Sequence, residues 1–515
     1  MDDERPPRLW WGMWKRFVLA GVLIVALSGA ATATVALNTV KSVELAVFPR
    51  GSHIDTPSNL ITYNGGAQTF LILGSDRRSG SKNAAESDAA PHSDTILLVR
   101  FDPSQHQTSV LSVPRDLMVN IDTKRGVYAN EKINAAYTIG AEQGGINYAS
   151  VLAAETIKRE VFPELQLNGI IDVNFSGFIK VVDTLGCAYV NVDHRYYNEN
   201  VGSTETDYTS INLQPGYQKL CYENALDYVR YRHTDSDFVR VARQQDFLRD
   251  LRQQINPANE LGQLETVAKA VGHAIRSNFQ ASENKLIELT KLIAFSQQKP
   301  LRQVKFLSAN VDDIVNGGSY VTSTPALEKK TLENFLHGDE QLSLPVAKPP
   351  SSHHSSHNHN HHGAHPASVS AASLDLYPTT SSGESEAVKA ALDVPFHVLY
   401  PTLQTGQAMQ QMVRPYALKD EQGRLHHAYV VVWQQNEIGG YYDFEGSDWL
   451  TPPLFAHSRN ATIDGREYKI VDDGAHIHVI GWQAGNVLYW LTNTLLEELS
   501  NAQMLAIAHS AQGLR

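Results

Sequence analysis

Three short apolar runs decide the fold of the first unit: LILGSDRR at residues 71–78, HSDTILLVRF at residues 92–101 and LSVPRDL at residues 111–117. We predict strands at Phe70–Leu73, Thr95–Phe101 and Ser109–Val113, because these runs are short, apolar and bounded by turn-forming residues. The connection DPSQHQ between the second and third strands begins with residues that favour turns, which predicts a hairpin.

Helical patterns follow these strands along the chain. They are expected at Ile146–Val161, Phe175–Leu185, Ala225–Tyr231 and Phe238–Ile255, with several more between Leu261 and Gln297. Mixed strands and helices predict an α/β (or α+β) sandwich, in which helices flank a central mixed, largely antiparallel sheet. We assign residues 67–340 to this unit.

Polar residues interrupt the predicted strands at places that share one edge of the sheet. Asp76 follows the first strand, Asp94 opens the second, and Arg115 and Asp116 follow the third. If successive strands run antiparallel, these positions meet at one rim. The carboxylates of Asp76 and Asp94 would suit Mg²⁺ (or Mn²⁺), a hard cation that takes oxygen ligands and shares them with substrate phosphates.

A second polar cluster, YVRYRHTDSDFVRVARQQ, spans residues 228–245. Guanidinium groups gathered this closely repel one another unless an anion lies between them, and their planar forks match phosphate oxygens. Asp237 is suited to cap the following helix, on which Arg240, Arg243 and Gln244 share one face. A solvated charged helix face is the alternative, and the residues alone leave both open. The members of the cluster are Arg230, Arg232, Asp237, Arg240, Arg243 and Gln244.

The N-terminal sequence predicts a membrane anchor. No charged residue occurs from Phe17 to Val40, and a helix of this length would measure about 36 Å against a bilayer core of roughly 30 Å. Basic residues before it place residues 1–16 in the cytoplasm and the chain from residue 41 outside, with residues 41–66 as a linker. A cleaved signal peptide ending near Ala31-Thr32-Ala33 is the alternative. Both interpretations export the remaining chain.

Composition narrows the class of protein. The chain has 515 residues, is 42% hydrophobic and 19% charged, and is too polar for a protein with many membrane spans. Its formal net charge of -12 argues against a role in wrapping nucleic acid, because such proteins need a basic surface to neutralise phosphates.

The C-terminal part divides into a linker and a second folded unit. Residues 341–390 are rich in His, Ser and Pro and predict a disordered linker, whose histidines would bind a metal ion only loosely. Residues 391–515 predict a small α+β domain of unassigned role, with a final helix announced by the capping box Ser500–Gln503. Its Trp and Tyr residues favour a core over a glycan-binding surface. The expected strands are His427–Gln434, His476–Trp482 and Val487–Leu491.

Six segments carry a family resemblance. In order and spacing, LILGSDRR, SDTILLVRFD, LSVPRDLMV, EKINAAYTIG, VNFSGFIKVVDTLG and YVRYRHTDSDFVRVARQQ resemble the LytR-CpsA-Psr family of envelope phosphotransferases. The resemblance is dense from Gln68 to Asp250 and extends to about Gly338. It implies a single-pass membrane protein whose extracytoplasmic domain transfers a glycopolymer from a polyprenyl-pyrophosphate carrier to peptidoglycan, leaving a phosphodiester link.

The resemblance also implies roles for individual residues. Asp76 and Asp94 would support Mg²⁺, and Asp94 or Asp116 would accept the proton of the acceptor hydroxyl. Lys132 and Asn134 would lie at the rim of the same pocket. The pyrophosphate clamp, oriented by Asp237 and Gln244, would consist of Arg78, Arg115, Arg230, Arg232, Arg240 and Arg243. Two alternatives stay open: a non-catalytic regulator that binds polyprenyl phosphate, and a phosphatase that releases it from the pyrophosphate.

One departure from the family pattern concerns cysteine. The family commonly has two glycines after the sequence VVDTL, whereas this chain has Gly186 followed by Cys187. The second cysteine is Cys221, and two cysteines in an exported domain favour a disulfide that braces the arginine-bearing segment. Two free buried thiols are the alternative.

Overall fold

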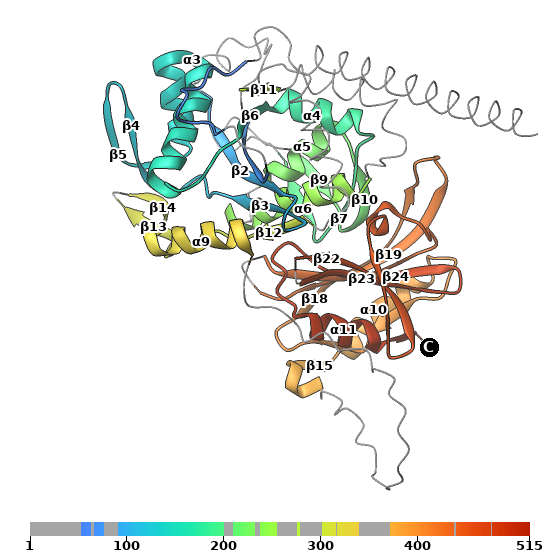
Figure 1. Ribbon diagram of the computed structural model, residues 1–515. Coiled ribbons are helices and arrows are strands. Elements are labelled where there is room, and N and C mark those ends of the chain that lie inside the picture. Colours follow the sequence, from blue (N-terminus) through green and yellow to red (C-terminus); the bar gives the residue numbers. More distant parts are fainter. Residues whose placement is uncertain are drawn as a thin grey trace, which may run out of the picture.

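The computed structural model describes residues 53–62, 66–76, 91–199, 210–231, 237–254, 275–278, 301–315, 317–338, 371–436, 439–474 and 476–514. Within these residues the chain forms two units, which Figure 1 shows lying against each other. The first contains a six-stranded sheet and the second a seven-stranded sheet.

The sheet of the first unit is mixed, as predicted. Its strands follow the order β11-β6-β1-β2-β3-β12. The pairs β1–β2, β2–β3 and β6–β11 are antiparallel, whereas β1–β6 and β3–β12 are parallel. The strands are β1 Gln68–Ser75, β2 Ser93–Asp102, β3 Gln107–Ser112, β6 Gly169–Asn174, β11 Ile275–Ser277 and β12 Leu301–Val304.

Helices cover this sheet on both faces, which explains why the middle of β1 and of β2 is a continuous apolar run. Leu71 and Leu73 point to one face and join a core with α3 and α9, while Ile72 points to the other face and packs in a cluster with Leu248 of α6. Successive side chains of a strand alternate between faces in this way. The helices are α3 Ala135–Thr156, α4 Phe175–Thr184, α5 Tyr222–Arg230, α6 Asp237–Gln254 and α9 Pro325–His337.

The predicted strands, and the hairpin between the second and third, are confirmed as β1, β2 and β3. The predicted helices correspond to α3, α4, α5 and α6, although α3 begins earlier than expected, at Ala135. Gly144 and Gly145 interrupt this helix, and Gly145 has φ 74°, a conformation that glycine adopts without steric cost. The interruption explains why the helical pattern in the sequence begins only at Ile146.

One element was not predicted and one boundary was wrong. The helices expected between Leu261 and Gln297 fall mostly outside the described residues, but the described part of this segment contains strand β11, which extends the sheet by pairing with β6. The predicted linker ends earlier than residue 390, because α10 Ser381–Ala391 is helical and its Ala387 lies in the core of the second unit.

The second unit is built on an antiparallel sheet with the order β18-β19-β20-β24-β23-β22-β21. Its predicted strands and its final helix, α11, are confirmed, and Ser500 and Gln503 form the capping box. Trp433, Trp482 and Trp490 are buried, which confirms the core interpretation. The elements are β18 Met409–Lys419, β19 Leu425–Gln434, β20 Tyr441–Ser447, β21 Arg459–Ile463, β22 Arg466–Asp473, β23 His476–Ala484, β24 Val487–Asn493 and α11 Asn501–Ser510.

Short two-stranded pairs complete both units. In the first unit they are β4 Met118–Thr123 with β5 Gly126–Lys132, β7 Ala188–Val192 with β10 Gly216–Leu220, β8 Tyr196–Asn198 with β9 Ile211–Leu213, and β13 Asn310–Val315 with β14 Gly318–Thr322. In the second they are β15 Leu376–Pro378 with β17 Leu403–Thr405, and β16 Leu399–Pro401 with β25 Ala511–Gly513.

The predicted membrane span, Phe17–Val40, lies outside the described residues. Among the residues that the structure does describe, no helix has the length and apolar character needed to cross a bilayer.

Candidate functional site

The ends of the three central strands meet, as the antiparallel arrangement requires. Ser75 at the end of β1 pairs with Ser93 at the start of β2, so Asp76 and Asp94 follow at the same edge. Arg115, just beyond β3, reaches this edge, where its Nη1 lies 2.7 Å from Asp94 Oδ1. The rim predicted from the sequence therefore exists.

Two further residues donate to Asp94, from the start of α3 and from α6. Asn134 Nδ2 lies 3.4 Å from Asp94 Oδ1, and Arg240 of α6 donates through Nη2 to the backbone carbonyl oxygen of Asp94 at 3.4 Å. Burial raises the pKa of Asp94, but the charges of Arg115 and Arg240 outweigh this effect and hold the pKa below its usual value. Asp94 is thus a carboxylate over the physiological range.

Asp76 has the opposite electrostatic balance. Burial and the nearby charge of Asp94 raise its pKa, against the backbone N–H of His92, which donates to Asp76 Oδ1 at 2.7 Å, and the charge of Arg230. Two carboxyl groups with opposed pKa shifts at one rim form an anionic pair that a cation would stabilise.

The two carboxyl groups fit a hard divalent cation. Their oxygens are the ligand type that Mg²⁺ prefers, and the described bonds of Arg115 and Asn134 to Asp94 engage only Oδ1. No group of three or more metal-ligating side chains occurs within the described residues. An ion held by Asp76 and Asp94 would therefore complete its coordination with water or substrate phosphate, as Mg²⁺ commonly does.

Asp116 lies beside this pair, in two ion pairs of its own. Lys132 Nζ is 2.7 Å from Asp116 Oδ1, and Arg115 Nε is 3.4 Å from Oδ2. Lys132 also lies over the ring of Tyr320, 5.6 Å from its centroid. Arg115 thus bridges Asp94 and Asp116, which joins the two carboxylates into one charged network.

The polar residues of α6 divide between two environments. Arg240 faces Asp94, whereas Arg243 is fully buried and lies over the ring of Tyr196 at 4.5 Å. Arg243 Nη1 donates to the carbonyl oxygen of Tyr231 at 2.7 Å, and Gln244 Nε2 donates to that of Val229 at 3.1 Å. These bonds tie α6 to the end of α5, so the described contacts of Arg243 and Gln244 are structural.

The remaining members of the predicted clamp are placed only in part. Arg230, at the end of α5, lies over the ring of Phe175 at 4.1 Å, and its charge acts on Asp76. Helix α6 begins at Asp237, whose side chain is outside the described residues, as are Arg78 and Arg232.

Sequence reasoning missed the residues that orient this site. His92 fixes Asp76, and Tyr196 links Arg243 Nε, at 3.1 Å, to Asp193 Oδ1, at 2.6 Å. His92 stands two residues before Asp94, a proximity that the sequence displays. Nothing in the sequence indicates that Tyr196 meets Arg243.

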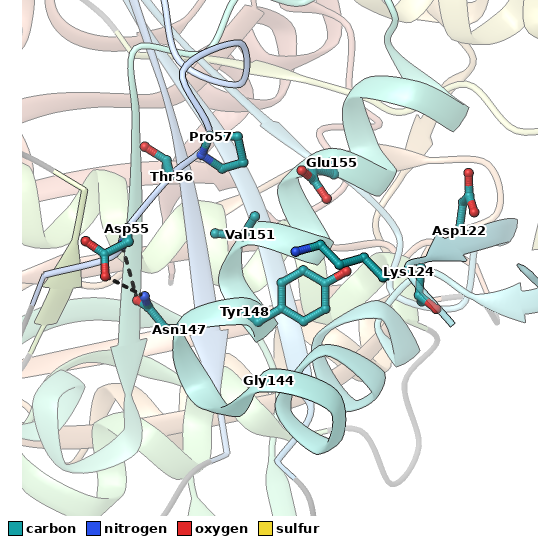
Figure 2. Close-up of a pocket in the computed structure, with 11 residues that line it drawn as sticks. Asp55, Thr56, Pro57, Asp122, Lys124, Gly144, Asn147, Tyr148, Val151 and Glu155 are labelled. Carbon is teal, nitrogen blue, oxygen red and sulfur yellow. Dashed lines mark hydrogen bonds between the residues drawn. The ribbon is translucent and has the colours of Figure 1, made fainter. Parts of the chain in front are cut away.

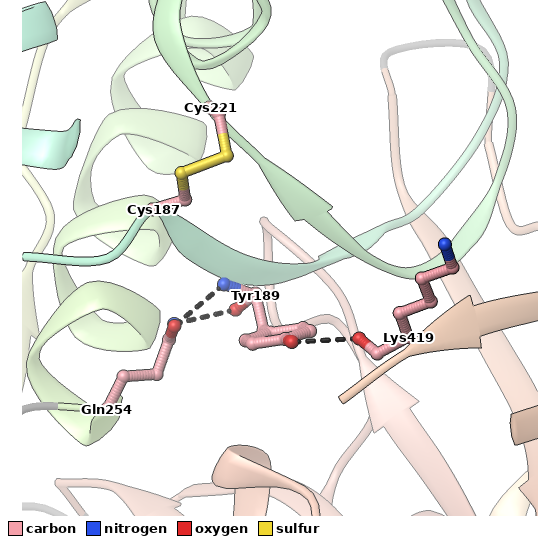
Figure 3. Close-up of a disulfide and its surroundings, with 5 residues drawn as sticks. All are labelled: Cys187, Tyr189, Cys221, Gln254 and Lys419. Atoms are coloured by element: carbon pink, nitrogen blue, oxygen red, sulfur yellow. Dashed lines mark hydrogen bonds between the residues drawn. A yellow bond between two sulfur atoms is a disulfide. The ribbon is translucent and has the colours of Figure 1, made fainter. Parts of the chain in front are cut away.

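The predicted disulfide between Cys187 and Cys221 is present (Figure 3). It joins the start of β7 to the residue before α5, which is the helix that ends at Arg230. Beside it, Tyr189 of β7 exchanges two hydrogen bonds with Gln254 at the end of α6, at 2.9 and 3.0 Å. The bridge therefore braces the arginine-bearing helices, as expected.

A cavity of about 690 Å³ lies away from this rim (Figure 2). It is bounded by Asp55, Lys124 in the β4–β5 turn, and Tyr148 and Glu155 in the second half of α3. None of the predicted site residues lines it. We therefore locate the candidate site from the charged rim around Asp94 and not from cavity size.

Known proteins resemble this chain over about half of its length. An uncharacterized protein of Staphylococcus aureus (strain NCTC 8325 / PS 47) is 29% identical over 279 residues, which are 53% of this chain and 62% of the relative. The polyisoprenyl-teichoic acid–peptidoglycan teichoic acid transferase TagT of Bacillus subtilis (strain 168) is 26% identical over 268 residues, covering 52% of this chain and 77% of TagT. This chain spans less than two thirds of the length of several curated relatives that it matches.

The crystal structure of B. subtilis TagV aligns with 53% of this chain and 97% of its own, at 22% identity and a TM-score of 0.40. The model of the LytR_cpsA_psr family matches residues 37–336, a range that contains every predicted residue of the charged rim and of the arginine cluster. Because this match covers more than half of the chain, the protein belongs to the LytR_cpsA_psr family.

Proposed function

We propose that the protein is a membrane-anchored phosphotransferase that moves a glycopolymer from a polyprenyl-pyrophosphate carrier onto peptidoglycan through a phosphodiester link. Family membership supports this function, as do the names of several relatives, which are polyisoprenyl-teichoic acid–peptidoglycan teichoic acid transferases. The observation that carries the proposal is the Asp94 carboxylate, which accepts from Arg115, with Arg240 on the backbone carbonyl oxygen of Asp94 and the Asp76 carboxyl at the same edge.

The charged rim combines arginines that suit the phosphates of a pyrophosphate with carboxylates that suit a proton acceptor. Arg115 and Arg240, which both contact Asp94, would bind the donor phosphates, and Arg230 would add charge from α5. An acceptor hydroxyl attacks the phosphorus that carries the glycan, its bond to the bridging oxygen breaks, and polyprenyl phosphate leaves with that oxygen. The hydroxyl proton passes to a rim carboxylate, for which Asp94 and Asp116 are our candidates. Positioning and charge neutralisation supply most of the catalysis in such transfers.

Mg²⁺ (or Mn²⁺) bound by Asp76 and Asp94 would neutralise charge on the phosphates. Other groups of the protein position the three carboxyl groups. Arg115 orients Asp94, Lys132 and Arg115 hold Asp116, and the backbone N–H of His92 fixes Asp76.

We also propose that Phe17–Val40 anchors the protein and leaves the catalytic unit outside the cytoplasm. The disulfide supports this placement, since such bonds persist in oxidising compartments.

The function is tested by substituting the central carboxylate in the full chain. Asp94→Asn should lower transfer of a polyprenyl-pyrophosphate-linked glycan to peptidoglycan, with Mg²⁺ present, by about 100-fold or more, because it removes the charge that the two arginines surround. Asp102→Asn is the matched control: Asp102 lies at the other end of β2 and pairs with Arg100 at 3.0 Å. Its transfer rate should stay near that of the wild type.

Two results would contradict the proposal. Transfer by Asp94→Asn at the wild-type rate would remove the site assignment. Release of polyprenyl phosphate with no glycan joined to peptidoglycan would identify a phosphatase.

A further inference from the structure

Helix α6 lies between the charged rim and the second unit. Arg240 and Arg249 are nine residues, about two and a half turns, apart, so they project from opposite faces. Arg240 donates to the backbone of Asp94, whereas Arg249 Nη1 lies 3.0 Å from Asp473 Oδ2 and 3.4 Å from Glu497 Oε1, both in the second unit. The same helix thus connects the site to residues outside the family match.

The contacts of Arg249 are buried and extend to the central sheet. Arg249 and Asp473 are each 3% exposed, and Arg249 also pairs with Asp246 of its own helix. Asp473 Oδ1 accepts from the backbone N–H of Gln303, on edge strand β12, at 2.9 Å. The carboxylate of Asp473, in the second unit, therefore joins α6 to the same sheet whose strand ends carry Asp94.

Further contacts fix both ends of α6. Near its start, Val239 and Ala242 pack against Leu495 of the second unit. At its end, Gln254 bonds to Tyr189, whose hydroxyl donates to the carbonyl oxygen of Lys419 at 2.8 Å (Figure 3). The second unit thus contacts the start and the middle of the helix directly and its end through Tyr189.

The position of α6 matters because even a small movement of this helix would affect the hydrogen bond between Arg240 and Asp94. The 3.4 Å distance of Arg240 from the Asp94 carbonyl oxygen is at the outer limit of a hydrogen bond, so a small shift of α6 would break it. Misplacing a reactive group by about 1 Å can cost about 100-fold in rate.

We propose that the second unit, residues 371–514, positions the arginine helix of the catalytic unit, with Arg249 and Asp473 as positioning residues that act through Arg240. The inference rests on the proposed function, and it gives the second unit a role in catalysis that needs no ligand of its own.

A double-mutant cycle in the full chain tests this role. Asp473→Asn should lower kcat for transfer about tenfold. In an Arg240→Ala background, the same change should have no further effect. If Asp473 served stability alone, the losses of total activity in the two single variants would multiply in the double variant. In that case Asp473→Asn would also leave the kcat of the folded fraction unchanged. Asp472→Asn is the control, since this neighbouring carboxylate pairs with Arg459 inside the second unit, at 2.5 and 3.0 Å.

Hydrogen exchange separates this inference from the proposed function. Peptides of residues 237–254 should exchange faster in Asp473→Asn than in Asp472→Asn, whether or not the wild-type protein transfers glycan. The inference would be overturned if these peptides exchanged in Asp473→Asn at the wild-type rate, or if the losses from Asp473→Asn and Arg240→Ala multiplied in the double variant. Should Asp473→Asn fail to fold, Glu497→Gln, at the longer 3.4 Å contact with Arg249, takes its place with the same expectations.

Discussion

At the residue scale, two arginines three positions apart in α6 have different surroundings. Arg240 reaches the site, whereas Arg243 is enclosed by the rings of Tyr196, Tyr228 and Tyr231, at 4.5, 5.6 and 5.7 Å. A guanidinium with carbonyl acceptors and three rings around it holds α5 and α6 together, because its planar donors point in several directions at once.

This contrast predicts that Arg243→Lys lowers the free energy of unfolding by about 2–3 kcal/mol, because one ammonium cannot replace the bonds to both Tyr196 and Tyr231. Arg230→Lys is the comparison: it keeps a cation over Phe175 and should cost less than about 1 kcal/mol. Urea unfolding of the full chain measures both. If Arg243→Lys weakened donor binding without loss of stability, its predicted place in the pyrophosphate clamp would be correct.

The sequence allowed Asp76, Asp94 and Arg115 to be brought together because strand ends follow from antiparallel order alone. The environment of Arg243 could not be found in the same way. Helical spacing places it near Arg240, but its partner Tyr196 lies 47 residues earlier in the chain. Periodicity shows which residues share a face and gives no information on what that face meets.

At the scale of elements, the disulfide occupies a strained turn between α4 and β7. Gly186 has φ 87° and Cys187 has φ 71°, so two successive residues are left-handed. This conformation explains why two glycines serve in the resembling family, since a residue with a Cβ pays about 1–2 kcal/mol there. Cys187 occupies this position in a disulfide with Cys221, which closes a loop with a sequence separation of 34.

Removing the bridge should therefore depend on the replacement. Cys187→Ala with Cys221→Ala should lower the free energy of unfolding by about 3–4 kcal/mol, the chain-entropy value for such a loop. Cys187→Gly with Cys221→Ala should recover about 1 kcal/mol, because glycine relieves the left-handed strain. Denaturation of both variants beside the oxidised wild type measures the difference. Equal stability of the two variants would show that the turn relaxes once the bridge is gone.

The elements themselves were predicted where a local signal existed. Apolar runs bounded by turns gave β1, β2 and β3, and the capping box gave α11. Strand β11, Ile275–Ser277, was missed because a segment of three residues is too short to show an alternating pattern. Its strand conformation depends on pairing with β6. Tertiary context, and not local preference, decides such elements.

At the scale of the whole molecule, the two units share a core that no local pattern could indicate. Tyr189 and Tyr217 of the first unit are buried in a cluster with Trp449 and Trp490 of the second. Asn191 Nδ2 donates to Asp443 at 2.9 and 3.0 Å, across a sequence separation of 252. Domains move relative to one another unless their interface is large and hydrophobic, and these contacts are buried and largely aromatic, so the units should move as one body.

The acids buried where the units meet predict how stability depends on pH. Burial raises the pKa of Glu445 and of Asp473 to about 7, whereas carboxyl groups titrate near 4 in an unfolded chain. The folded protein therefore keeps protons that the unfolded chain has lost, so the stability from these groups is complete below about pH 4 and declines as the pH rises through 7. His478, whose pKa burial lowers, opposes this trend below about pH 6.5.

The decline should consequently be clearest between about pH 6.5 and 8, in the unfolding free energy of the full chain. Glu445→Gln should flatten it, because glutamine still accepts from the backbone N–H of Tyr217, at 3.2 Å in the wild type, and has no proton to lose. The exposed Glu467 of β22 supplies the control, since Glu467→Gln should leave the pH profile unchanged. A Glu445→Gln profile as steep as that of the wild type would mean that the decline comes from other buried acids, namely Asp473 and Asp250, whose pKa burial also raises to about 7.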